Sequence, residues 1–482
     1  MIRTSKMNGF TYNAIRERSE LNNMKPLSVK HIRTTIAGDL IQGSDDMIVY
    51  HGAYRLKQVK KPNTVLFSKQ KIVKWERLKE FFPIVLVTHQ SYSPNEKLEN
   101  LTVIKVKDTE EAYWRFVNDY RNLFQIPVVA ITGTSGKTTT KEMLCHILSV
   151  GKSVACTNSS NNSRTAHLHY LLSIDEDTEA AVFETAVGAP GDVRNAGKYF
   201  KPTIGIITNI GAHHLNYCKT LEGYIQAKGE MCEALEQKGV LIVNADDRNS
   251  EKLNLNQYNG RIIKVGIHSS CDFKARDIQY CPNGMRFTVQ YEHNEYPMFV
   301  PGIGEHQVYN ALAALAAAHE MGIDFHEIAH QLKTFRNLNK HLQLFDGING
   351  STILDDTWSI TTTSLEAALK VLNEVGQGKN KIAILGTITD LGSWGYIIHE
   401  QAGELIYQIG VDVLITIGEH ARIMADQAVY CGLNAPVYTF NNSTLVFDLL
   451  KRITDENTII LIKGDMYSKP IIELAVKLRK KE

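Results

Sequence analysis

The chain has 482 residues, which is too long for a single hydrophobic core and predicts about three domains. Its 53 basic and 52 acidic residues give a formal net charge of +1 at pH 7, so the charge does not indicate a polyanionic partner such as a nucleic acid. The seven cysteines form no C-x-x-C pair and are odd in number, which favours a reducing cytosol over a disulfide framework or a structural zinc site.

The N-terminal residues lack the apolar core of a signal peptide, and no window reaches the roughly 18 apolar residues that a membrane span requires. We therefore expect a soluble, cytoplasmic protein. Residues 1–124 are predicted to form a small α/β domain. Apolar runs at Thr64–Phe67 and Ile84–Val87 are typical of strands, and a polar helical pattern follows from Glu110 to Leu123.

The next segment joins a buried strand to a helix through a glycine-rich loop. Residues 128–131 form a short apolar run typical of a covered parallel strand, and the apolar residues within 143–148 recur at helical spacing. The loop between them has the sequence Thr-Gly-Thr-Ser-Gly-Lys-Thr-Thr at residues 132–139. Its glycines allow a tight turn that directs backbone N–H groups at phosphate oxygens, and the following helix adds the positive end of its dipole. The pattern predicts a nucleoside triphosphate site.

Individual roles follow from the chemistry of the loop. Lys137 is predicted to reach the terminal phosphates, and the hydroxyl of Thr138 is predicted to bind Mg²⁺. A glycine-rich turn without a ligand is the alternative, and the Gly-Lys-Thr sequence argues against it. The candidate nucleotide-binding residues of the loop are Gly133, Thr134, Ser135, Gly136, Lys137, Thr138 and Thr139.

Strands and helices alternate through the rest of the chain. From about residue 125 to 337 the alternation predicts a doubly wound sheet, with a β hairpin region at 276–296 and a helix at 308–321. A second α/β layer is predicted at 338–482. The buried strands expected in these two domains are 180–184, 204–208, 240–243, 353–354, 382–385, 413–416 and 459–462.

The phosphate loop has an unusual form, because Ile131 stands five residues before Gly136, where Gly or Ala is usual. This form resembles the loop of the Mur ligase and folylpolyglutamate synthetase superfamily. The resemblance implies an α/β fold of three domains: an N-terminal substrate-binding domain, a central doubly wound P-loop ATP-binding domain and a C-terminal Rossmann-like domain. It also implies a ligase that uses ATP and Mg²⁺ to join a carboxylate to an amine through an acyl phosphate.

Three further segments of the central domain resemble Mur ligase motifs. Residues 184–193 nominate Glu184 as a magnesium ligand, residues 207–215 nominate His214, and residues 225–231 nominate Lys228, which matches a lysine that is carbamylated in most Mur ligases. Without the resemblance, these side chains are also consistent with an exposed strand-end acid, a hydrogen-bonding histidine and a surface lysine. The resemblance implies Thr138, Glu184, His214 and Lys228 as metal ligands, and Lys137, His214 and Lys228 as catalytic residues.

Three residues are assigned to the rest of the nucleotide site by the same resemblance. Asn310 matches the position that holds adenine, and an amide can pair with both a donor and an acceptor on that base. Asp356 lies in a matching C-terminal motif. His341 stands near the position of an arginine that contacts nucleotide phosphates in the family. Because a histidine is mostly neutral at pH 7 and lacks the guanidinium fork, weaker phosphate binding or a substitute residue is expected.

The C-terminal motifs narrow the substrates that the resemblance implies. Residues 353–359 and 385–392 resemble those of the Mur ligase that adds D-alanyl-D-alanine to a UDP-muramyl peptide in peptidoglycan precursor synthesis. Residues 359–362 (Ser-Ile-Thr-Thr) and 463–466 (Lys-Gly-Asp-Met) depart from the family pattern, and the N-terminal domain lacks the signatures that bind UDP-sugars. We expect the ATP-dependent ligase reaction to be retained and the substrate pockets to be altered.

The expected partners are small molecules: a carboxylate acceptor such as a UDP-muramyl peptide, and an amino acid or dipeptide. We expect a monomer whose C-terminal domain closes over ATP about a hinge at 335–345. Two alternatives remain open, namely a divergent Mur ligase paralogue that forms a different amide bond and a non-catalytic ATP-binding protein that kept the fold. A P-loop kinase or GTPase fits the loop less well.

Overall fold

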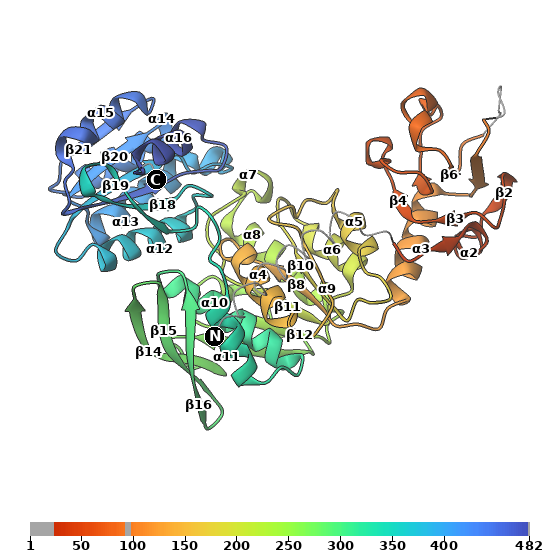
Figure 1. The fold of residues 1–482 in the computed structure, drawn as a ribbon, viewed down its shortest axis with the longest axis horizontal. Coiled ribbons are helices and arrows are strands. Elements are labelled where there is room, and N and C mark those ends of the chain that lie inside the picture. Colours follow the sequence, from red (N-terminus) through yellow and green to blue (C-terminus); the bar gives the residue numbers. More distant parts are fainter. Residues whose placement is uncertain (1–23, 92–97, 481–482) are drawn as a thin grey trace, which may run out of the picture.

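The computed structural model of the protein describes residues 24–91 and 98–480, and its large sheets lie in three lobes (Figure 1). Successive segments of the chain build the N-terminal, central and C-terminal sheets. The central lobe lies between the other two. Within the described residues, no helix has both the length and the apolar character needed to cross a bilayer.

The N-terminal lobe contains a five-stranded sheet in the order β2-β7-β6-β5-β4, in which β2 runs antiparallel to its neighbour and the other pairs are parallel. Helix α3 connects this lobe to the central one, where the hydroxyls of Tyr113 and Tyr199 share a hydrogen bond of 2.7 Å. The elements are β1 (Leu27–Ser28), α2 (Val29–Thr35), β2 (Asp39–Gln42), β3 (Ile48–Val49), β4 (His51–Ala53), β5 (Thr64–Phe67), β6 (Ile84–Thr88), β7 (Leu101–Lys105) and α3 (Thr109–Asn122).

The central lobe contains a nine-stranded sheet in the order β16-β15-β14-β13-β12-β11-β8-β10-β9. Its strands are parallel from β9 to β14, and β14, β15 and β16 form antiparallel pairs. The elements are β8 (Val128–Thr132), α4 (Lys137–Leu148), β9 (Val154–Cys156), α5 (His167–Leu172), β10 (Ala180–Glu184), α6 (Asp192–Phe200), β11 (Ile204–Ile207), α7 (Leu215–Cys218), α8 (Leu221–Gly229), α9 (Met231–Ala234), β12 (Val240–Asn244), β13 (Arg261–Gly266), β14 (Phe273–Cys281), β15 (Gly284–Tyr291), β16 (Asn294–Pro301), α10 (Glu305–Glu320) and α11 (Phe325–Thr334).

Both faces of the central sheet are covered because side chains alternate along each strand. Val129 and Ile131 of β8 belong to the core shared with α4, α10 and α11. Ala130 of the same strand and Ile207 of β11 belong to the core shared with α8 and α9. The doubly wound architecture predicted from the sequence is therefore confirmed.

The C-terminal lobe contains a six-stranded sheet in the order β17-β18-β22-β19-β20-β21, with only β17 antiparallel to its neighbour. The elements are β17 (Gln343–Asp346), β18 (Thr352–Asp356), α12 (Thr362–Val375), β19 (Asn380–Gly386), α13 (Gly395–Ile409), β20 (Val413–Ile417), α14 (Glu419–Tyr430), β21 (Val437–Phe440), α15 (Thr444–Ile453), β22 (Thr458–Lys463) and α16 (Lys469–Leu478).

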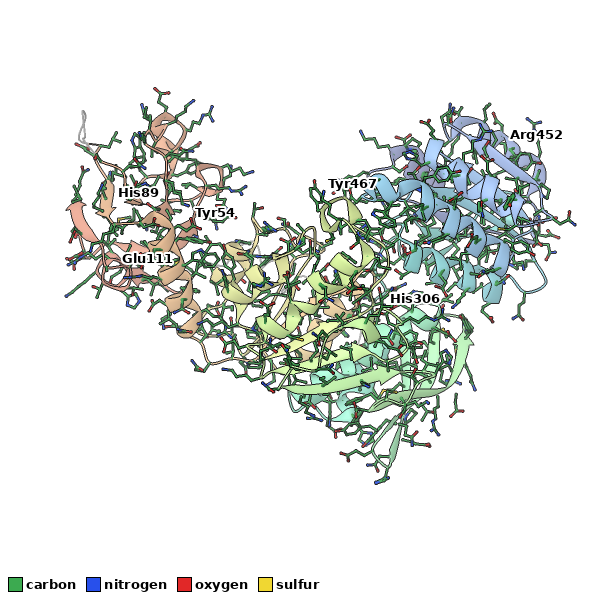
Figure 2. All side chains as sticks on the ribbon, turned by 180° about the vertical axis from the view of Figure 1, so that it is seen from behind. Tyr54, His89, Glu111, His306, Arg452 and Tyr467 are labelled. Carbon is green, nitrogen blue, oxygen red and sulfur yellow. A yellow bond between two sulfur atoms is a disulfide. The ribbon has the colours of Figure 1, made fainter. Side chains whose placement is uncertain are left out.

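The segments between the sheets, residues 123–127 and 335–342, contain no helix or strand in the described structure. The boundaries at 124 and 337 and the hinge at 335–345 remain predictions. Seen from behind, His306 at the start of α10 lies where the central and C-terminal lobes approach one another (Figure 2). Ser135 of the glycine-rich loop contacts Thr361 and Thr363 of the C-terminal lobe, so the candidate site is built from both lobes.

Candidate functional site

The glycine-rich loop connects β8 to α4 with two backbone conformations that only glycine adopts readily. Gly133 has φ of +148° and Gly136 has φ of +81°. A Cβ atom at Gly133 would collide with the hydroxyl of Thr208, and one at Gly136 would collide with the side-chain oxygen of Asn310. The loop is therefore packed tightly on both sides, and its glycines are required by space as well as by conformation.

Asn209 holds the loop in place. The backbone N–H of Thr134 donates to the backbone oxygen of Asn209 at 2.8 Å, and that of Ser135 donates to its side-chain oxygen at 3.0 Å. The side-chain amide of Asn209 donates back to the Ser135 carbonyl at 3.0 Å. The N–H groups of Thr134 and Ser135, two of the predicted phosphate-contacting residues, are thus bonded within the protein and do not point at a phosphate. The N–H groups of the first turn of α4, from Lys137 to Thr139, have no partner inside the helix, and such a helix start attracts anions.

Thr138 and Glu184 bring two oxygen ligands together at the carboxyl edge of the sheet. The hydroxyl of Thr138 donates to one carboxylate oxygen of Glu184 at 2.9 Å, and the amide of Asn162 donates to the other at 2.6 Å. Glu184 is only 2% exposed, so it is not an exposed strand-end acid. A buried carboxylate beside a threonine hydroxyl is a donor set that suits Mg²⁺, which prefers oxygen ligands.

Lys228 lies at the end of α8 and touches the phosphate loop. Its amine donates to the carbonyl of Gly133 at 2.8 Å and to the hydroxyl of Thr132 at 3.3 Å, and it lies 4.8 Å from the centre of the Tyr224 ring. The side chain is 1% exposed, so the surface-lysine alternative is wrong. Burial, together with the nearby charge of Lys137, lowers the pKa of Lys228 well below its usual range.

Lys137 begins α4 and donates to the carbonyl of Thr134 at 3.0 Å. Burial lowers the pKa of its amine, and the carboxylate of Glu184 opposes this shift. Two lysines therefore contact carbonyls of one short loop.

His214 follows β11 and has a left-handed backbone conformation with φ of +51°. Its Nδ1 lies 3.5 Å from a carboxylate oxygen of Asp390, which belongs to the C-terminal lobe. Burial, with the charges of Lys137 and Lys228, lowers the pKa of His214 to about 4. Among the described residues, no hydrogen bond or ion pair joins His214 to Glu184 or Lys228, so its place in their metal site remains a prediction.

Asn310 lies beside the loop, where its side-chain oxygen accepts a hydrogen bond from the Thr140 hydroxyl at 3.4 Å. Its contact with Gly136 puts the amide at the loop end of the site. The role predicted for Asn310 at adenine is not tested by these contacts.

His341 and Asp356 come from the C-terminal side of the junction. The His341 ring stacks on Trp358 with 5.6 Å between ring centres, and burial lowers the pKa of this histidine. Asp356 forms an ion pair with the fully buried amine of Lys463.

His306 is missing from the sequence-based candidates. Its Nδ1 is buried and has no hydrogen-bond partner among the described residues, and its pKa is lowered to about 4, chiefly by burial.

A direct contact joins the phosphate loop to the C-terminal lobe. The hydroxyl of Ser135 lies 2.8 Å from that of Thr363 and 3.1 Å from that of Thr361, at the start of α12. Gly211 also approaches Thr363 so closely that a Cβ atom there would collide with its methyl group. No sequence pattern relates residues so far apart along the chain, and neither threonine was a candidate.

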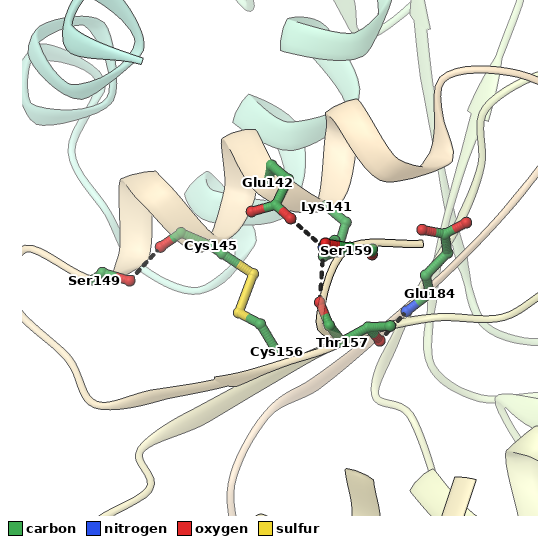
Figure 3. The surroundings of a disulfide bond; sticks show 8 residues. All are labelled: Lys141, Glu142, Cys145, Ser149, Cys156, Thr157, Ser159 and Glu184. Carbon is green, nitrogen blue, oxygen red and sulfur yellow. Dashed lines mark hydrogen bonds and ion pairs between the residues drawn. A yellow bond between two sulfur atoms is a disulfide. The ribbon is translucent and has the colours of Figure 1, made fainter. Parts of the chain in front are cut away.

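The cysteine prediction requires a correction, because Cys145 of α4 and Cys156 of β9 form a disulfide (Figure 3). The two residues are 11 positions apart, and the packing of α4 over β9 brings their Cα atoms to 6.7 Å. Spacing alone does not reveal such a pair. The disulfide lies next to Thr157, whose hydroxyl accepts the N–H of Glu184 at 2.9 Å and whose carbonyl accepts the amine of Lys141 at 2.7 Å.

Two family models match the chain. The Mur ligase middle domain matches residues 131–318, and the Mur ligase glutamate ligase domain matches residues 342–466. The UDP-N-acetylmuramoyl-tripeptide–D-alanyl-D-alanine ligase of Bacillus subtilis is 29% identical over 367 residues, which cover 76% of this chain and 79% of that protein. The ligase of the same name from Escherichia coli is 27% identical over 370 residues, covering 76% and 80% of the two chains.

Solved structures support the fold. A structure of MurF from Acinetobacter baumannii matches with a TM-score of 0.80 at 21% identity, covering 94% of this chain and 100% of that one. The MurF ligase of Thermotoga maritima in complex with ADP matches with a TM-score of 0.72 at 18% identity, covering 89% and 97%. At these identities the likeness concerns the three-domain architecture.

Proposed function

The chain belongs to the Mur ligase family, and we propose that it uses ATP to join a carboxylate to an amine through an acyl phosphate. As substrates we propose a UDP-muramyl tripeptide and D-alanyl-D-alanine, the compounds in the names of its relatives. The product is then a precursor of peptidoglycan. The observation that carries this proposal is the contact of the buried Lys228 amine with the loop that leads to Thr138, whose hydroxyl donates to the carboxylate of Glu184 at the end of β10.

ATP is proposed to bind with its phosphates at the first turn of α4. Lys137, Thr138 and Thr139 supply N–H groups there, and the amine of Lys137 neutralises phosphate charge. The other loop residues shape this turn, since Gly133 and Gly136 allow it and Thr134 and Ser135 are held by Asn209. For the nucleoside part we propose Asn310, His341 and Asp356.

Magnesium is proposed to bind Thr138 and Glu184, with a second site at His214 and Lys228. The oxygen pair of Thr138 and Glu184 supports the first assignment directly. When bound, the ion neutralises phosphate charge and polarises the γ-phosphoryl group.

Lys228 is proposed to react with carbon dioxide before catalysis. A neutral amine is the reactive form, and the lowered pKa of Lys228 increases the fraction of this form. Its nitrogen forms a bond to the carbon of CO₂, one C=O bond becomes a carboxylate oxygen, and the amine proton leaves to water. The product is an anionic oxygen donor beside Lys137, and it replaces a neutral amine with a group that attracts the Lys137 ammonium.

The reaction itself consists of two displacements. A carboxylate oxygen of the acceptor forms a bond to the γ-phosphorus of ATP, the bond to the β,γ-bridging oxygen breaks, and ADP leaves. The amine nitrogen then forms a bond to the acyl carbon, phosphate leaves with the former carboxylate oxygen, and the nitrogen loses a proton. Lys137, His214 and Lys228 are proposed as the catalytic residues, acting through position and charge.

The three lobes divide these tasks in our proposal. Residues 1–124 bind the carboxylate substrate, and residues 125–337 bind ATP. Residues 338–482 bind the amine substrate and close over the nucleotide about a hinge at 335–345. The contact of Ser135 with Thr361 and Thr363 supports communication between the last two lobes. We further propose a monomeric, cytoplasmic enzyme.

A second candidate is a paralogue that forms a different amide bond. Asp465 follows β22, where its carboxylate accepts from Thr389, and Met466 is its neighbour. Neither side chain is positively charged, so neither can pair with the carboxylate group of an amine substrate such as a dipeptide. This observation favours a changed amine rather than a lost reaction, because the loop, Glu184 and Lys228 remain intact.

The proposal is tested by phosphate release from ATP in the presence of Mg²⁺, bicarbonate, UDP-muramyl tripeptide and D-alanyl-D-alanine. We expect release to require both substrates and to fall by about 100-fold or more in Lys137→Ala. Lys238→Ala is the matched control, because this lysine is exposed and its ion-pair partner in the described structure is Glu236. Release that is independent of both substrates would argue against a ligase.

A further inference from the structure

The disulfide between Cys145 and Cys156 joins the helix that follows the phosphate loop to a strand that leads toward Glu184 (Figure 3). Cys145 lies in α4, about two turns after Thr138. Cys156 is the last residue of β9, and Thr157 follows it directly. The covalent bond therefore ties the start of the segment after β9 to the helix whose first turn we assign to ATP.

The segment 157–162 positions Glu184. The hydroxyl of Thr157 accepts the backbone N–H of Glu184 at 2.9 Å, and the side-chain amide of Asn162 donates to its carboxylate at 2.6 Å. The fully buried amine of Lys141, in α4, donates to the carbonyl of Thr157 at 2.7 Å. The disulfide and this hydrogen bond thus both connect α4 to the segment that holds Glu184.

The disulfide is accessible from one side. Cys145 is only 2% exposed, whereas Cys156 is half-buried and belongs to β9, the last strand of the central sheet. A thiolate can therefore reach the sulfur of Cys156 from the edge of the sheet, and thiol–disulfide exchange depends on such access. In the reducing cytoplasm that we assign to this chain, a disulfide usually has a redox-sensing or catalytic role rather than a permanent structural one.

We propose that Cys145 and Cys156 form a reversible redox switch that controls how firmly Glu184 is held; its effect on Mg²⁺ rests on the function proposed above. A dithiol reductant loses a proton and attacks the sulfur of Cys156, the bond between the two protein sulfurs breaks, and Cys145 leaves as a thiolate that takes up a proton. The second thiol of the reductant then loses its proton and attacks the mixed disulfide. Cys156 is released as a thiol, and the reductant is oxidised to a disulfide.

Reduction removes the covalent bond and leaves the segment 157–162 joined to α4 by hydrogen bonds such as that from Lys141. Thr157 and Asn162 are the contacts that orient Glu184, so a looser segment holds this carboxylate less rigidly. Loss of outer contacts to a metal ligand lowers metal affinity. We therefore expect the Mg²⁺ concentration that supports ATP binding to be about 10-fold higher in the reduced form.

The test compares the oxidised and reduced forms of the full chain without nucleotide. Glutathione disulfide prepares the first form and dithiothreitol the second, and mass spectrometry after alkylation counts the free thiols of each. Hydrogen exchange then measures the protection of residues 157–162 and of the Glu184 N–H. We expect reduction to expose two more thiols and to speed exchange at both places on the order of 10-fold.

Two variants show which cysteines respond. Cys156→Ser should exchange as the reduced form does, with or without reductant. Cys281→Ser is the matched control, because Cys281 is a half-buried free cysteine of the same lobe. This variant should respond to reductant as wild type does. The main comparison uses wild type in its two forms and therefore does not depend on how either variant folds.

A disulfide that resists reductant in the folded chain would overturn the switch, and so would equal exchange of Glu184 in the two forms. A Mg²⁺ titration of ATP binding follows. Equal midpoints in the two forms would overturn the effect on the magnesium site. An absence of Mg²⁺-dependent ATP binding from both forms would instead contradict the proposed ligase function, while the exchange comparison would still decide the switch.

Discussion

The amine of Lys228 donates a hydrogen bond of 2.8 Å to the carbonyl of Gly133, so a fully buried lysine rests directly on the phosphate loop. This contact connects the nucleotide site to the residue for which we propose carbamylation. Burial is the main cause of the low pKa of Lys228, and the charge of Lys137 acts in the same direction.

We expect Lys228→Ala to lower ligase turnover by about 100-fold or more while leaving ATP binding largely intact. The reason is that the proposed carbamate acts on the transferred phosphoryl group and not on the nucleoside. Phosphate release and equilibrium binding of ATP measure the two effects separately. Wild-type turnover should also fall when bicarbonate and CO₂ are removed, and turnover indifferent to both changes would contradict the proposed role.

The lowered pKa of Lys228 predicts a pH dependence of stability. In the folded chain this amine loses its proton at a pH where the unfolded chain, with a lysine pKa of about 10.4, still holds it. Between the two pKa values the unfolded state binds more protons, so the free energy of unfolding rises with pH. Denaturant unfolding in CO₂-free buffer should show a steeper rise for wild type than for Lys228→Met as the pH approaches the unfolded lysine pKa of about 10.4. Parallel curves would count against a depressed pKa.

Glu184→Gln should raise the Mg²⁺ concentration needed for nucleotide binding by at least about 10-fold. The substitution keeps the size of the side chain and removes the negative charge beside the Thr138 hydroxyl. The measurement is a Mg²⁺ titration of ATP binding. Glu179→Gln is the matched control, because Glu179 lies before β10 and its carboxylate accepts the backbone N–H of Ser153 at 3.0 Å, away from Thr138. Equal effects of the two variants would disprove the assignment of Glu184.

Gly136→Ala should weaken ATP binding by about 10-fold or more, since a left-handed backbone costs a non-glycine residue roughly 1–2 kcal/mol. The new methyl group also collides with Asn310. Gly151→Ala, where no atom lies within 4 Å of the added Cβ, should leave binding unchanged. Isothermal titration of both variants with ATP provides the comparison, and normal affinity in Gly136→Ala would contradict the geometry of the loop.

The pair Cys145 and Cys156 predicts five free thiols in denatured protein purified without reductant. A disulfide that closes a loop of 11 residues contributes about 3 kcal/mol to the free energy of unfolding. Reductant should remove this stability from wild type and have no effect on Cys156→Ser. Seven reactive thiols would show that the pair stays reduced in the purified protein.

Short sequence patterns predicted the strands and turns that are defined by neighbouring residues. The apolar run of β8 and the glycines of the loop predicted the strand, turn and helix that the structure shows, and the run ending at Glu184 placed this acid at the sheet edge. Strands β9 and β21 were missed because most of their residues are only half-buried, so they lack a continuous apolar run.

The parts of the site that the sequence did not reveal are contacts between distant segments. Asn209 holds the phosphate loop across 74 positions, and the Ser135 hydroxyl meets Thr363 across 228. The approach of Asp390 to His214 depends on how two lobes pack. Such pairs follow from tertiary structure and carry no local signal of periodicity or spacing.

The central claim, an acyl phosphate formed from ATP, is tested most directly by oxygen transfer. The reaction contains Mg²⁺, bicarbonate, D-alanyl-D-alanine and UDP-muramyl tripeptide whose terminal carboxylate carries ¹⁸O. Mass spectrometry then measures ¹⁸O in the phosphate released and the mass of the amide product. We predict one labelled oxygen in each phosphate together with the ligated pentapeptide. Phosphate without label, released at the same rate, would mean that water and not the carboxylate attacks ATP, and would contradict the account.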